Sequence, residues 1–354
     1  SNNPATLVSM MANDNANQAI LSSAGDMSTV QAKYHDISSS HLNDRLTAVE
    51  SYIIPGYGAN AGTLVNGWVQ ESVANGLTRT TGTNAGIRLD QITQKTLWGA
   101  VSYWQGTSKY MSKIPTDDNS VASDDANYTA MEHHWDESFG YFGAALDYNT
   151  GYADDVDRKS SPYNDSNSDG SIDFKSEYNV GWAITAAKRD DCSACDINHD
   201  FTKTIFDAYL EGRTLITNQA DLADILVQRD IVTNNWEKVV AAVSIHYVNN
   251  VASDIAGLIA AGDTAIVAGS DATADYENHW SEMRGYANGL LYNDFKVITD
   301  ANLDRILTVM GTAPVYPSNG NFDAMQAYHT SLVGEVRAIF KASYGFSDAN
   351  VAGW

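Results

Sequence analysis

Apolar residues along most of this chain recur every three or four positions, which is the spacing of a helix with one buried face. The clearest run, within residues 234–262, consists of Val239, Val243, Tyr247, Val251, Ile255 and Ile259. The same spacing recurs over residues 61–75, 88–113, 123–148, 200–218, 221–232, 269–292 and 321–343. Strand-like alternation is scarce, and only 6 prolines interrupt the chain. The pattern therefore predicts an all-α fold.

Residues 149–176 break this pattern, because they are rich in Asp, Asn, Ser and Gly. Such a composition predicts a long loop, and loops of this length are uncommon unless they are functional or held in place. At 354 residues the chain also exceeds what one ordinary domain core holds. We therefore expect an N-terminal helical half over 1–148, a linker over 149–199 and a C-terminal helical half over 200–354.

Within the linker, the stretch "DSNSDGSIDFKSE" has oxygen-bearing residues at the positions of a calcium-binding loop. The predicted ligands are Asp165, Asn167, Asp169, Ser171 (through its carbonyl), Asp173 and Glu177. Gly170 stands where such a loop turns sharply. Pro162 argues against a helix entering the loop, whereas "EYNVGWAITAAKR" predicts a helix leaving it. A bound Ca²⁺ would stiffen the linker; the alternative is a solvated polar turn.

A ten-residue pattern occurs twice, as "EHHWDESFGY" over 132–141 and as "ENHWSEMRGY" over 277–286. Both copies read E-x-H-W-x-E-x-x-G-Y, and their offset of 145 residues divides the chain into two comparable halves. An internal duplication explains such a repeat, so we expect two pseudo-symmetric helical bundles joined by the calcium-loop linker. The shared glycines, Gly140 and Gly285, are expected to let a neighbouring helix approach closely.

On a helix the repeat places a histidine and a glutamate on one face, because residues three apart are neighbours there. The two pairs are His134 with Glu137 and His279 with Glu282. Imidazole and carboxylate groups one turn apart can bind iron, zinc, copper or manganese, so both pairs are predicted metal ligands. A histidine–glutamate hydrogen bond that braces the helix is the alternative. Candidates for additional ligands from other helices are Glu50, Glu71, Glu211 and His246.

The charge balance narrows the range of partners. The chain has 44 Asp and Glu against 21 Lys and Arg, which gives a formal net charge of −23. Such a surface repels phosphate backbones and attracts cations. It therefore argues against nucleic-acid binding and agrees with metal ions as partners, although a halotolerant surface is an equally simple explanation.

Cys192 and Cys195 form a single C-x-x-C between acidic flanks. One such pair is too small for a structural zinc site, which needs four ligands, and nearby carboxylates would blunt the reactivity of a free thiol. We therefore predict a disulfide that closes a short loop, with free thiols as the alternative, and hence an oxidising compartment. No apolar run approaches the roughly 18 to 20 residues that span a membrane.

The segments "EHHWDESFGYFG", "SDGSIDFKSEYN" and "ENHWSEMRGYANGLLYND" together resemble a group of exported bacterial lipoproteins related to the imelysins. The resemblance extends from about residue 45 to the end of the sequence. It implies two helical bundles related by pseudo-symmetry, a periplasmic or cell-surface location that is compatible with a lipid anchor, and a link to iron.

The imelysin signature G-x-H-x-x-E is matched at its histidine and glutamate in both copies, whereas Glu132 and Glu277 stand in place of its glycine. Neither copy contains H-E-x-x-H or H-x-x-E-H, the signatures of zinc peptidases. We therefore expect an exported, imelysin-like protein that binds or takes up a transition metal, iron before zinc or copper, with a structural Ca²⁺ in its linker. One alternative is a dimetal or hydrolytic enzyme on the same residues. The other is a structural or adhesive surface module that binds calcium only.

Overall fold

The computed structural model describes residues 8–9, 11–12, 17–76, 82–123 and 126–354, and it is mainly helical, as the sequence predicts. The α-helices are α2 Tyr34–Ile37, α3 Leu42–Thr47, α4 Ala61–Asn75, α5 Leu89–Leu97, α6 Ala130–Phe142, α7 Asp155–Ser160, α8 Gly181–Asp190, α9 Phe201–Thr217, α10 Leu222–Ala261, α11 Ala274–Gly289, α12 Asp300–Met310, α13 Asp323–Ser331, α14 Arg337–Tyr344 and α15 Asp348–Gly353. Segments of π-helix are η1 Trp98–Tyr103, η2 Gln105–Met111 and η5 Leu332–Val336, and short 3₁₀ turns are η3 Asp271–Thr273 and η4 Leu290–Tyr292.

The predicted helices differ from the observed ones mainly at their ends. Helix α4 has the predicted bounds, whereas the expected helix over 123–148 shortens to α6. Thr129 and Glu132 form a capping box that begins α6, and Gly143, with φ +86°, ends it. The stretches 221–232 and 234–262 merge into the 40-residue α10, because Asn235 bonds the carbonyl of Ile231 within the helix instead of breaking it.

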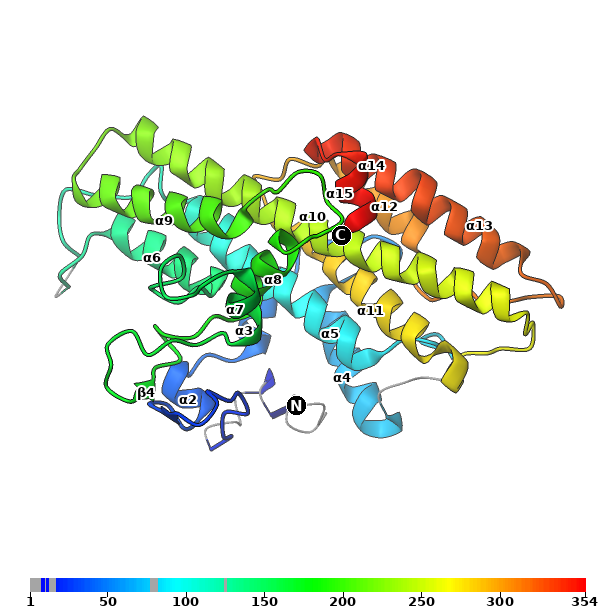
Figure 1. The fold of residues 1–354 in the computed structure, drawn as a ribbon. Coiled ribbons are helices and arrows are strands. Elements are labelled where there is room, and N and C mark those ends of the chain that lie inside the picture. The colour runs from blue at the N-terminus through cyan, green and yellow to red at the C-terminus, as the bar shows by residue number, and fades with distance from the viewer. Residues whose placement is uncertain (1–7, 10, 13–16, 77–81, 124–125) are drawn as a thin grey trace.

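Helix α10 organises the molecule (Figure 1). Its first half packs against α9 and its second half against α11, while α5 and its continuation η1–η2 lie against α11 and α6. The buried apolar residues form one contiguous cluster that draws on both halves of the chain. Trp182 of α8 lies inside this cluster, with its ring 5.6 Å from that of Trp98, 6.0 Å from that of Tyr286 and 6.4 Å from that of Trp236.

The strands are short, and one of the two strand pairs joins segments that are distant in sequence. Strands β2 Ile53–Ile54 and β3 Ala59–Asn60 form an antiparallel hairpin. Strand β1 Ser28–Thr29 pairs in parallel with β4 Ser171–Ile172, which lies inside the predicted calcium loop. The loop before it is not featureless, because α7 lies within the expected linker and ends at Ser160, ahead of Pro162. Helix α8 follows the loop, as predicted.

Two further features concern the setting of the protein. Cys192 and Cys195 are joined by a disulfide in the turn after α8. Within the described ranges, no helix is both long and apolar enough to cross a membrane.

Candidate functional site

The first copy of the repeat lies on α6, and both ring nitrogens of its histidine are engaged. His134 Nδ1 lies 2.7 Å from Asp117 Oδ2, and His134 Nε2 lies 3.0 Å from Lys113 Nζ. A lysine ammonium can only donate, so Nε2 accepts and the proton sits on Nδ1, which donates to Asp117. Both partners follow η2 in the chain. The histidine therefore bridges a carboxylate and an ammonium.

The second copy lies on α11 and has a related but more open arrangement. His279 Nδ1 lies 2.7 Å from Asp254 Oδ2 on α10, and this hydrogen bond raises the pKa of His279 above its ordinary value. Glu282 accepts hydrogen bonds from Tyr247 Oη at 3.0 Å and from Asn278 Nδ2 at 2.9 Å. The ammonium of Lys95, on α5, lies 3.4 Å from Glu282 Oε1. Here the lysine meets the glutamate, not the histidine.

In each copy the repeat extends beyond the motif helix to one aspartate and one tyrosine. In the first copy the ring of Tyr110 lies 5.8 Å from that of His134 and 5.9 Å from that of Tyr141. In the second copy the ring of Tyr247 lies 6.1 Å from that of His279 and 5.6 Å from that of Tyr286. Tyr141 and Tyr286 belong to the motif, whereas Tyr110, Tyr247 and the two aspartates were not predicted from the sequence. Their signal is a shared Y-x₆-D, which runs from Tyr110 to Asp117 in one copy and from Tyr247 to Asp254 in the other.

These partners define two separate sites. The histidine of each copy bonds an aspartate outside its own motif, not the glutamate one turn away. The first site draws on residues 110–117 and the second on α10 and α5. Across the part of the chain that the structure describes, no group of three or more His, Cys, Asp or Glu side chains is placed to hold a metal ion.

The additional candidate ligands lie in varied settings. Glu50 and Glu211 are exposed, and Glu71 accepts a hydrogen bond from Asn84 at 2.5 Å. His246 lies on α10 one residue before Tyr247, with Nε2 3.3 Å from Asn250 Nδ2. Burial, and then the neighbouring Arg189, lower the pKa of His246 to about 3, so its imidazole is neutral at physiological pH. Among the four candidates, His246 is the one next to the second site, because it directly precedes Tyr247, whose hydroxyl bonds Glu282.

The glutamates that open the two copies of the motif, Glu132 and Glu277, have structural partners. Glu132 completes the cap of α6 at Thr129 and lies 2.6 Å from Arg213 Nη1 on α9. Burial acts to raise the pKa of Glu132, but the hydrogen bonds from Thr129, Thr217 and Arg213 outweigh it and lower that pKa. Glu277 is buried and accepts from the Gly269 amide at 2.7 Å. Both residues fix the start of a motif helix.

The shared glycines do not behave alike. A Cβ on Gly285 would lie 2.6 Å from Lys95 Cβ, so the glycine lets α5 approach α11. At Gly140 nothing lies within 4 Å of such a Cβ. The predicted close approach therefore occurs in the second copy, and the prediction for Gly140 is wrong.

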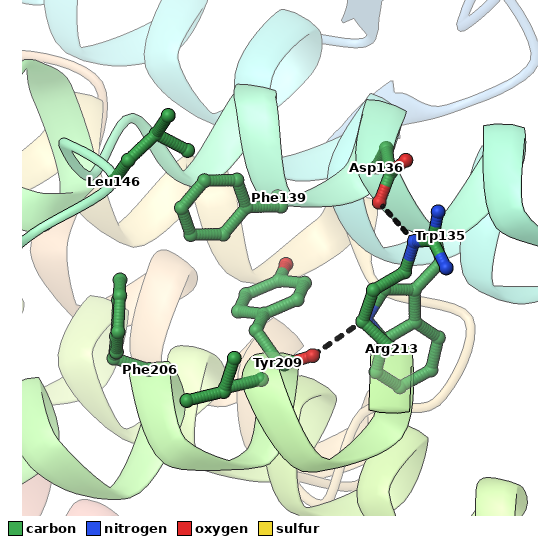
Figure 2. Close-up of a pocket in the computed structure, with 8 residues that line it drawn as sticks. Trp135, Asp136, Phe139, Leu146, Phe206, Tyr209 and Arg213 are labelled. Atoms are coloured by element: carbon green, nitrogen blue, oxygen red, sulfur yellow. Dashed lines mark hydrogen bonds and ion pairs between the residues drawn. The ribbon is translucent and has the colours of Figure 1, made fainter. Parts of the chain in front are cut away.

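Another face of α6 lines a small pocket shared with α9 (Figure 2). Its walls are mainly apolar side chains, and its volume is about 170 Å³. The apolar walls are formed by Trp135, Phe139, Leu146, Phe206, Tyr209 and Leu210. Arg213 and Asp136 form an ion pair at one end. Leu146 lies beyond the end of α6 at Phe142 and is 67% exposed.

The predicted calcium loop is folded into a closed ring. Asp165 accepts hydrogen bonds from the backbone amides of Asp169 at 3.1 Å and Gly170 at 2.9 Å. Gly170 has φ +85°, which suits the sharp turn. Glu177 is only 2% exposed, and its Oε1 accepts from the amides of Ser166 at 3.0 Å and Asn167 at 3.3 Å. Glu177, the last predicted ligand of the loop, thus lies against Ser166 and Asn167 near its start.

The N-terminal segment closes the other side of this loop. Gln31 Nε2 donates to Asp173 Oδ1 at 2.8 Å, and Gln31 Oε1 accepts from the amide of Phe174 at 2.9 Å. Strand β1 adds its parallel pairing with Ser171 and Ile172. The loop is therefore held by a segment more than a hundred residues away in sequence.

Fold and sites together define a mainly helical protein with a duplicated Asp–His–Tyr arrangement and a closed polar loop over 165–177. A family model described as a domain of unknown function, DUF4856, matches residues 6–274. The match covers more than half of the 354 residues, so the chain belongs to this family. It includes α6 and the loop, and it ends at the first residue of α11. No curated protein and no solved structure matches the chain.

Proposed function

We propose that this protein is a metal-binding protein whose loop 165–177 binds a calcium ion. The observation that carries the proposal is the folding back of the buried Glu177 onto the amides of Ser166 and Asn167, which brings both ends of the loop together. The donor set fits, because calcium takes six to eight hard oxygen ligands at such spacing. Those oxygens belong to Asp165, Asn167, Asp169, Ser171, Asp173 and Glu177.

The ion would tie the linker to the N-terminal segment. Asp173 is a predicted ligand and also the acceptor for Gln31. Ser171 and Ile172 lie in the loop and also pair with β1. A cation that fixes these residues therefore also fixes residues 28–31.

Calcium titration tests this proposal. Saturating Ca²⁺ should raise Tm, because an ion at a hundred times its Kd adds about 2.7 kcal/mol to the stability of the folded state. The Asp169→Ala/Glu177→Ala variant should lose both the binding heat and the Tm increase. Glu211→Ala/Asp304→Ala removes the same charge from exposed positions and should behave as wild type. Equal Tm of the wild type in Ca²⁺ and in chelator would refute the site.

A transition metal, iron first, is the second candidate function, and the second copy of the repeat favours it. Asp254 holds His279 through Nδ1, which is how second-shell carboxylates orient a histidine that binds metal through Nε2. Glu282 would be its carboxylate partner once the ammonium of Lys95 moves away. The first copy fits less well, because Lys113 already occupies Nε2 of His134.

Metal content separates the two copies. After incubation with Fe²⁺ and desalting, wild type and His134→Ala should retain iron, whereas His279→Ala should lose it. Zn²⁺ and Cu²⁺ serve as parallel tests of identity. Equal iron in wild type and His279→Ala would refute this second function while leaving the calcium site untouched.

We further propose that the protein is exported and has the two-bundle organisation of the imelysin-like proteins. The disulfide between Cys192 and Cys195 supports an oxidising compartment. The matching Asp–His–Tyr sets of the two copies support a duplicated architecture. Fractionation of the native host should recover the protein outside the cytoplasm, with no thiol available to alkylation before reduction; recovery in the cytoplasm would contradict export.

A further inference from the structure

Arg284 of α11 is completely buried, and its nearest partners belong to the β2–β3 hairpin. Its Nη2 donates to the carbonyl of Pro55 at 2.5 Å, and its guanidinium lies 5.1 Å from the ring centre of Tyr57. Gly56, between them, has φ +85°, and a Cβ there would stand 2.9 Å from Thr312 Cγ2. The hairpin is therefore shaped to fit closely over this one side chain.

Among the described residues, Arg284 belongs to none of the ion pairs between basic and acidic side chains, so no carboxylate there balances its positive charge. Its Nε and Nη1 atoms are buried and have no hydrogen-bond partner within the described part of the chain. Burial lowers the pKa of Arg284, yet a guanidinium keeps its proton in proteins. An unpaired charge in such a place is strongly destabilising.

We propose that Arg284 anchors a binding site for a small monovalent anion, of the size of a halide. A water molecule could accept hydrogen bonds from the free N–H groups but would leave the positive charge uncompensated. An anion would accept these hydrogen bonds and also balance the charge. The surroundings favour a small ion, since the groups that interact with the guanidinium are the uncharged Tyr57 and Tyr328 side chains and the carbonyl of Pro55. A larger dianion would need more donors than this site supplies. This site is independent of the calcium loop and of the His–Glu pairs.

Halide-specific stabilisation is the solution test. Protein dialysed into sodium gluconate should gain at least about 2 °C in Tm when chloride or bromide replaces gluconate at equal ionic strength. Arg284→Met should abolish this difference, whatever its own Tm. Arg305→Met is the matched control, because it removes an exposed arginine that pairs with Glu335, and it should keep the full difference.

A crystal soaked in bromide provides a test that needs no variant. An anomalous peak beside Nε or Nη1 of Arg284 is expected. Water alone at these atoms, or a wild-type Tm that is identical in gluconate and halide, would overturn the proposal. A halide effect that persists in Arg284→Met would overturn it as well.

Discussion

His279 links the second site to pH through one hydrogen bond. Asp254 raises the pKa of His279 above the ordinary value of about 6.5. A histidine with a raised folded-state pKa adds stability that is fully present below pH 6.5 and is lost as pH rises through the folded-state pKa. The charge of this side chain therefore stabilises the fold on the acidic side of neutrality.

Asp254→Asn should remove this contribution. The expected result is a lower pKa of His279, measured by NMR titration of its ring protons, and a smaller stability difference from wild type at pH 8 than at pH 5.5. His246 acts in the opposite sense, because its pKa of about 3 makes stability fall as pH drops below 6.5. Because His246 is present in both proteins, its contribution cancels in the stability difference between Asp254→Asn and wild type. That difference therefore reports on His279. An unchanged His279 titration in Asp254→Asn would contradict the assignment.

Helices η1 and α11 meet at two glycines. A Cβ on Gly99 would lie 2.4 Å from the Cα of Gly289, which is closer than real contacts allow. Close backbone contact here places η1 against the end of α11, near the ring of Tyr286 on that helix and Trp98 on η1. The position of Tyr286 in the second site thus depends on a backbone contact between two glycines that involves no polar side chain.

Gly99→Ala should lower the free energy of unfolding by about 1–3 kcal/mol, the usual cost of overpacking. Gly67→Ala is the matched control, since Gly67 lies in α4 with nothing within 4 Å of the added Cβ. It should be neutral or stabilising by about 0.5–1 kcal/mol. Urea unfolding of both variants measures the difference, and equal effects would contradict the close-contact explanation.

Sequence periodicity predicts elements well where the signal is local. Helix α4 and the motif helices follow from apolar spacing, whereas the start of α6 at the Thr129 cap was not predicted. Asp117 and Asp254 were not predicted, because their meeting with His134 and His279 depends on how separate helices pack. The merging of two predicted helices into α10 was missed for a related reason: a polar Asn234–Asn235 pair can stay inside a helix that packing holds on both sides.

The whole molecule shares one core. The four most deeply buried tryptophans, Trp135, Trp182, Trp236 and Trp280, come from both halves of the chain and lie in one contiguous apolar cluster. Helix α10 belongs to the C-terminal half of the chain, yet the ring of its Trp236 lies against those of Tyr103 and Phe142 from the N-terminal half. Neither half can therefore lose its structure without exposing apolar surface of the other.

We expect one cooperative thermal transition, seen at the same temperature by calorimetry and by near-ultraviolet circular dichroism. Trp182→Leu, which disturbs the centre of the cluster, should lower that single midpoint without splitting it. Two resolved transitions in the wild type would instead indicate two independently stable halves.

The contact between Gln31 and Asp173 spans 142 residues, and this separation has a kinetic consequence. During synthesis the N-terminal segment emerges early, but its pairing partners in the loop are made much later. Closing so long a stretch of chain is entropically costly until the intervening helices have packed. Docking of residues 28–31 onto the loop is therefore a late step in folding, and the calcium ion that we propose would act at the end of the folding pathway instead of at its start.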